Sequence, residues 1–153
     1  YKAEGQEYIP IELWGQDHWS TLAYLETVAV DSKGIIDHRR MRCNARLHGY
    51  FKHGKEDGAK YPTLLKGGKA DNHDDWSCLE DMVAAGLLLA WTQHYGSSKV
   101  KIELTDLGWK VAGQLRRYRA EGGKYEEFEP TIDLTEAEWV LEQIREVKRR
   151  GGL

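Results

Sequence analysis

Residues 74–121 carry the most regular hydrophobic pattern in the chain, and this pattern restricts the fold more than any other feature. The segment opens with apolar residues at the spacing of one helix face, and Gly86 follows where such a helix would end. Asp74 or Asp75 is suited to cap the start of this helix. The apolar residues on the predicted face are Trp76, Leu79, Met82 and Val83.

A β-hairpin and a second helix are expected after Gly86. Residues 87–93 form a strand-like apolar run, residues 95–98 have the composition of a turn, and residues 99–104 alternate polar with apolar side chains. Thr105 is suited to cap the next helix, which Gly122 and Gly123 would end. The sequence therefore predicts helix, hairpin and helix in this order.

Two pieces of this segment, LEDMVAAGLL (79–88) and ELTDLGWKVAGQL (103–115), resemble winged-helix proteins of the type found in bacterial regulators. In that family a helix ending in Gly-Leu leads into the wing, and an L-T-x-x-G turn opens the following helix. The resemblance covers residues 74–121, about a third of the chain. It implies a winged-helix-like core, DNA binding and a role in transcription regulation.

The expected fold class is α+β, a single domain over residues 1–153. An extended arm (1–16) precedes a helix that Asp17 would cap, and Val28, Val30, Ile35 and Ile36 around the turn 31–34 suggest a hairpin. Glycines punctuate the loops up to residue 72, which carry one short element at 61–65. A capping box at 135–138 opens a C-terminal helix within 131–150.

Composition sets limits on the function. A chain of 153 residues can bury one core, and its longest apolar run, 82–91, is too short to cross a bilayer, so no membrane partner is expected. Two cysteines are too few for a disulfide framework and favour a cytoplasmic location. The sequence carries no signal for an oligomeric state.

Residues 38–55 are strongly basic, although the net charge of the chain is −3. This stretch holds six Lys or Arg residues, three histidines and no acidic residue, so it predicts a nucleic-acid contact. The alternative is that its cations pair with acidic helices elsewhere in the same chain. The expected contact residues are Arg39, Arg40, Arg42, Arg46 and Lys52, together with Lys99 and Lys101 of the wing.

The first helix of the winged-helix-like segment is acidic, which suggests a second function. We expect its carboxylates to face outward, where phosphates would repel them, so the helix would read DNA poorly. It would instead dock on a basic protein partner or mimic the charge of nucleic acid. The residues expected on this interaction surface are Asp74, Asp75, Trp76, Glu80 and Asp81.

Metal binding and catalysis are the remaining alternatives. The spacings Cys43-x4-His48 and His73-x4-Cys78 provide four ligand types for a tetrahedral zinc site, although ordinary buried cysteines would give the same pattern. His73-Asp74-Asp75 has the residue types of a metal-dependent phosphohydrolase pair, and His38, Asn44 and His48 have those of a nuclease. Because further ligands are lacking, we expect a binding protein without catalytic activity and with no required cofactor.

Overall fold

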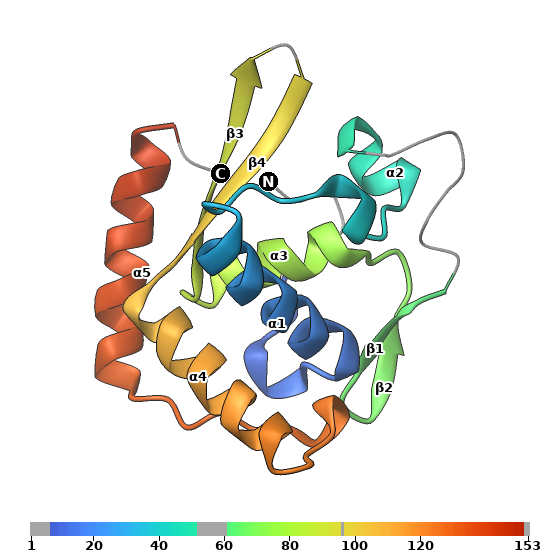
Figure 1. Cartoon of the computed structure of the whole chain (residues 1–153), viewed down its shortest axis with the longest axis vertical. Helices are drawn as coiled ribbons and strands as arrows, with labels where there is room; N and C mark the ends of the chain where they lie inside the picture. The colour runs from blue at the N-terminus through green and yellow to red at the C-terminus, as the bar shows by residue number, and fades with distance from the viewer. Residues whose placement is uncertain (1–6, 52–60, 96, 152–153) are drawn as a thin grey trace.

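The computed structural model describes residues 7–51, 61–95 and 97–151, and shows a single small α+β domain (Figure 1). Two antiparallel hairpins lie among the helices, and each is a separate two-stranded sheet. The helices are α1 (Gln16–Asp31), α2 (Ala45–His48), α3 (Asp75–Ala84), α4 (Asp106–Ala120) and α5 (Leu134–Arg149). The strands are β1 (Thr63–Leu65), β2 (Gly68–Ala70), β3 (Leu88–Tyr95) and β4 (Ser97–Leu104). Short 3-10 turns are formed by Ile11–Leu13, His38–Arg40, Gly49–Phe51 and Tyr125–Glu127.

The predicted helix, hairpin and helix of residues 74–121 are confirmed as elements, and local hydrogen bonds set their ends. The Asp74 carboxylate accepts the Ser77 N–H and caps α3, and Gly86 leaves the helix with a φ of 88°. The Thr105 hydroxyl accepts the Gly108 N–H and caps α4. Residues 100, 102 and 104 of β4 face the core, as their alternation predicts.

The hairpin predicted around residues 31–34 is wrong, because α1 continues to Asp31. Val28 extends the buried stripe of Trp19, Leu22 and Leu25, and packing along this stripe keeps the backbone helical. The chain then turns at Gly34, and Ile36 donates its N–H to Val100 of β4. The second half of the predicted hairpin therefore lies against β4.

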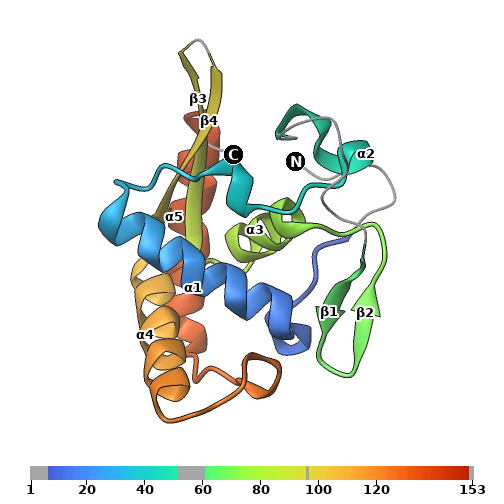
Figure 2. The same ribbon diagram turned by 45° about the vertical axis from the view of Figure 1, so that its right-hand side comes forward.

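Helices α1 and α3 form the centre of the domain (Figure 2). Eight of the ten residues of α3 are buried. α1 packs on α3, α4, β1 and β4, and the arm preceding it buries Trp14. No helix in the described ranges is long and apolar enough to cross a membrane.

The remaining predicted elements are found in part. The element expected at 61–65 is β1, and its partner β2 was not predicted. α5 lies within the range expected for the C-terminal helix and buries Val140 and Ile144. The side chains of 134–137, which include most of the expected capping box, lie outside the described part of the structure.

Gly108 provides a test of the contact between α4 and the start of the hairpin. A Cβ at this position would lie 2.0 Å from the Leu87 carbonyl oxygen, so Gly108→Ala forces backbone atoms apart. We expect it to lower the free energy of unfolding by about 2 kcal/mol or more, as overpacking does.

Gly113→Ala is the matched control in the same helix, because the nearest atom to its added Cβ is Arg116 Nη2 at 3.8 Å. Its expected effect is a gain of about 0.5–1 kcal/mol from helix propensity. Urea unfolding measures both variants. Equal effects of the two substitutions would contradict the close backbone contact.

Candidate functional site

The carboxylates of α3 are buried, so the prediction that they face outward is wrong. Asp74, Asp75 and Asp81 are 0%, 8% and 1% exposed, and Trp76 is 2% exposed. Glu80 is half-buried. Buried charges need partners to offset lost hydration, and the basic and histidine-rich segments of the same chain supply them here. These side chains therefore do not form an open docking surface.

Asp74 anchors the segment around α2 to the start of α3. One carboxylate oxygen accepts the Ser77 N–H and hydroxyl, and the other accepts the Asn44 N–H at 2.8 Å. The same carboxylate bonds His48 Nδ1, while His48 Nε2 lies 3.0 Å from Glu80. His48 thus joins two carboxylates of one helix.

Asp75 binds Arg42, which precedes the segment around α2 in the basic stretch. Its carboxylate accepts the backbone N–H of Arg42 at 2.8 Å and bonds the guanidinium at 3.1–3.2 Å. Asp17 of α1 lies 3.4 Å from the same guanidinium. Arg42 is therefore neutralised within the molecule, as the ion-pairing alternative for the basic stretch anticipates.

The other residues predicted to contact nucleic acid differ in whether they form an ion pair. Arg39 is exposed but pairs with Asp37. Arg40, Arg46 and Lys99 are exposed and Lys101 is half-buried, and none of them forms an ion pair with a residue in the described ranges. Lys52 lies outside the described residues.

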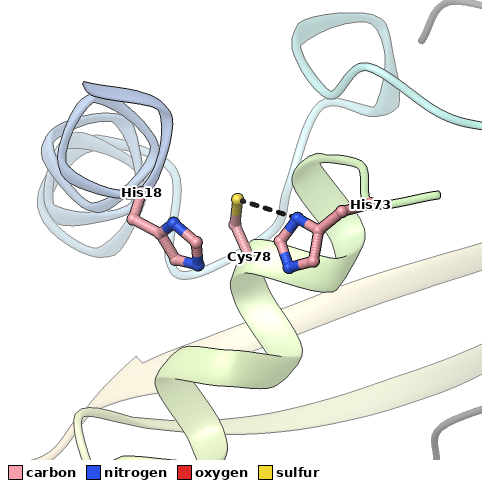
Figure 3. A group of neighbouring side chains, drawn as sticks. All are labelled: His18, His73 and Cys78. Carbon is pink, nitrogen blue, oxygen red and sulfur yellow. Dashed lines mark hydrogen bonds between the residues drawn. The ribbon is translucent and has the colours of Figure 1, made fainter. Parts of the chain in front are cut away.

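Asp81 binds three segments at the centre of the domain. Its Oδ2 lies 2.8 Å from His18 Nε2 and 2.7 Å from His73 Nε2, and its Oδ1 accepts the Ile9 N–H. Cys78 lies beside this network, with its sulfur 3.9 Å from His73 Nδ1 (Figure 3). The network joins the arm, α1 and α3.

His18 is a member of this cluster that sequence reasoning missed. Its position on the buried stripe of α1, one turn before Leu22, is a weak signal of a histidine that faces the core. Its partners lie 55 and 63 residues away in the chain, so no local motif connects them.

The four residues predicted to bind zinc do not meet at one point. His73 and Cys78 lie together with His18, whereas the Cys43 thiol donates to the His48 carbonyl and both His48 ring nitrogens bond carboxylates. The physical reason is that His48 bonds Asp74 and Glu80 and its carbonyl accepts the Cys43 thiol, whereas His73 bonds Asp81 and Thr63. The only cluster of potential metal ligands in the described ranges is His18, His73 and Cys78.

The side chains suggested for metal-dependent catalysis diverge in the same way. His73 bonds Asp81 and Thr63, Asp74 bonds His48, and Asp75 bonds Arg42. His38 packs against aromatic rings, at 5.1 Å from that of Trp76. The consecutive residues 73–75 therefore do not share a ligand position.

A cavity of about 200 Å³ adjoins the His48 and Glu80 pair. Trp76 and Phe51, whose rings stack at 4.5 Å, line it together with Lys148 of α5. Its wall is mainly apolar.

Comparisons of the chain with protein-family models, curated proteins and solved structures found no significant match. The positions of charged and polar side chains therefore provide the grounds for inferring a function.

The two carboxylates beside His48 predict a pH-dependent stability. Burial lowers the pKa of His48, but the hydrogen bonds and charges of Asp74 and Glu80 outweigh it and raise the pKa from 6.5 to about 9. A raised pKa in the folded state stabilises the fold below the unfolded pKa, and this contribution is lost as pH rises through about 9.

We expect the protein to lose stability between about pH 7 and pH 10, and His48→Gln to lose less over this range. Urea unfolding at several pH values measures the difference between the two proteins. It should be largest near pH 6 and should shrink toward pH 10. Parallel curves would contradict a role for the charged imidazole.

Proposed function

We propose that this protein binds nucleic acid through a basic end, which we define by Arg40, Arg46, Lys99 and Lys101. The observation that carries the proposal is that none of these four cations forms an ion pair in the described part of the chain, where Arg40 instead lies over the Tyr24 ring at 5.5 Å. Cations that form no ion pair in the unbound protein can neutralise phosphates and release their counterions.

The arrangement of the elements supports this grouping. Residues 34–36 run along β4, with a bridge between Ile35 and Lys101, and the turn His38–Arg40 follows directly. In both views the β3–β4 hairpin and α2 lie toward the same end of the molecule (Figure 1, Figure 2). The three segments that carry the four cations therefore lie toward this end.

An aromatic side chain accompanies the lysines on the hairpin. Trp91 of β3 pairs with Lys101 of β4, and directly opposite residues lie on the same face of a two-stranded sheet. Trp91 is half-buried, while the other face carries the buried residues Val100 and Ile102. A partly exposed indole beside Lys101 is suited to stack on an unpaired base.

A winged-helix-like arrangement of α3, the hairpin and α4 is part of this proposal. In it the wing and the turn at Arg40 contact the nucleic acid, and α3 does not. Because α3 is buried on most sides, it lacks the free face that insertion into a DNA groove requires. Because the same residues are buried, the alternative function, a protein-interaction surface on α3, has less support.

Replacing Arg40 and Arg46 together by Ala tests the basic end. We expect weaker binding to unrelated single-stranded and duplex oligonucleotides alike, and a salt dependence shallower by about 0.7–0.9 for each lost phosphate contact. Shift assays from about 50 to 200 mM salt measure the slope. Arg42→Ala is the matched control, since its guanidinium is occupied by Asp75 and Asp17.

The control variant should lower the melting temperature and leave the salt slope unchanged. Absence of binding by the unmodified protein even at low salt would refute the proposal. So would a double variant that binds like the unmodified protein.

Trp91→Leu tests the stacking contribution separately. It keeps an apolar side chain on the hairpin, and we expect it to weaken binding to single strands by about 1–3 kcal/mol with the salt slope unchanged. Duplex binding should change little, because paired bases are already stacked. An equal loss for both forms would argue against stacking.

A further inference from the structure

We propose that His18, His73 and Cys78 bind one divalent transition-metal ion of the class that prefers nitrogen and sulfur ligands, to which Zn²⁺ belongs. One potential ligand atom from each residue lies within 4.8 Å of the others. In Figure 3 the sulfur of Cys78 lies between the two imidazole rings. The inference does not depend on nucleic-acid binding.

The separation of one pair of ligand atoms is close to that of a tetrahedral site. His73 Nδ1 and Cys78 Sγ are 3.9 Å apart. Zinc bonds of about 2.3 Å to sulfur and about 2.0–2.1 Å to nitrogen place two such atoms roughly 3.5 Å apart. A small side-chain adjustment therefore brings this pair to ligand distance.

Asp81 orients both imidazoles in the way that carboxylates support metal-bound histidines. Its Oδ2 bonds Nε2 of His18 and Nε2 of His73, which leaves Nδ1 of each ring as the nitrogen available to an ion. A shared carboxylate also brings a negative charge beside the cation.

His18 Nδ1 is the observation that distinguishes a metal site from an ordinary buried network. It is fully buried and has no hydrogen-bond partner in the described part of the chain. Burial lowers the pKa of His18, which favours the neutral imidazole with a free lone pair. An unpaired buried acceptor destabilises the fold, and an ion at this position would remove that cost.

An ion can replace the interactions that His73 and Cys78 make in its absence. His73 Nδ1 bonds the Thr63 hydroxyl at 2.8 Å, and that hydroxyl has a second partner in the His73 carbonyl at 3.0 Å. Burial raises the pKa of the Cys78 thiol well above its ordinary value. Binding would therefore displace the thiol proton to solvent and leave the thiolate on the metal.

Three protein ligands leave one tetrahedral position for a non-protein ligand. The ligands come from α1, the residue before Asp74 and the first turn of α3, and His18, His73 and Cys78 are 0%, 6% and 0% exposed. An ion there would link these segments inside the core. We therefore expect it to raise the melting temperature of the chain.

Titration of the untagged chain with Co²⁺ and with Zn²⁺ tests the site. We expect about one equivalent of either ion to bind, with a thiolate-to-cobalt charge-transfer absorption and a higher melting temperature. Affinity for Zn²⁺ should rise by about tenfold for each pH unit, because one thiol proton is released. This absorption in the unmodified protein identifies a cysteine ligand without any substitution.

Cys78→Ser should abolish the charge-transfer absorption, and the matched variant of the other buried cysteine, Cys43→Ser, should retain it. Circular dichroism shows whether each variant folds. If Cys78→Ser does not fold, His18→Gln replaces it, with an expected loss of affinity of at least about tenfold.

Less than about a tenth of an equivalent bound by the unmodified chain would overturn the proposal, as would binding without the thiolate absorption. The proposal would also be overturned if Cys43→Ser lost that absorption and Cys78→Ser retained it, because the ion would then be bound by Cys43.

Discussion

The packing of this domain depends on one buried carboxylate. Asp81 of α3 bonds His18 of α1, His73 before α3 and the backbone of Ile9 in the arm. An isolated charge in this position would cost several kcal/mol, so folding must bring all of these donors to α3 at once. The arm, α1 and α3 therefore take their relative positions from a single side chain, around which the apolar residues pack.

The two carboxylates at the start of α3 extend the same principle to the basic stretch. Asp74 and Asp75 bind His48 and Arg42, so part of the positive charge that stands out in the sequence serves the fold. Arg40 and Arg46 lie beyond the reach of these carboxylates. The cations of this stretch thus fall into two sets, those in ion pairs and those without one. Only the cations without an ion pair are candidates for contacting phosphates.

The parts of the fold that the sequence predicted correctly are those governed by local interactions. Asp74, Gly86 and Thr105 act within one helical turn of their own positions, so the elements of residues 74–121 could be placed closely. The end of α1 could not, because its turn-like sequence favours a hairpin while burial of Val28 against distant residues favours a helix. The burial of Asp74, Asp75 and Glu80 depends on contacts with residues 26–33 positions away, and the cluster with His18 on contacts 55 and 63 positions away. Spacing gives no signal for either.

The join between α3, the hairpin and α4 has a mechanical consequence. Thr105 donates its hydroxyl to the Gly86 carbonyl and its N–H to the Leu87 carbonyl, and Gly108 lies directly against that second carbonyl. Both ends of the hairpin are thereby clamped at its base, while the pairing with residues 34–36 reaches only to Val100. We therefore expect the base of the hairpin to move with α3 and α4 as one unit, and the part beyond Val100 to bend more readily.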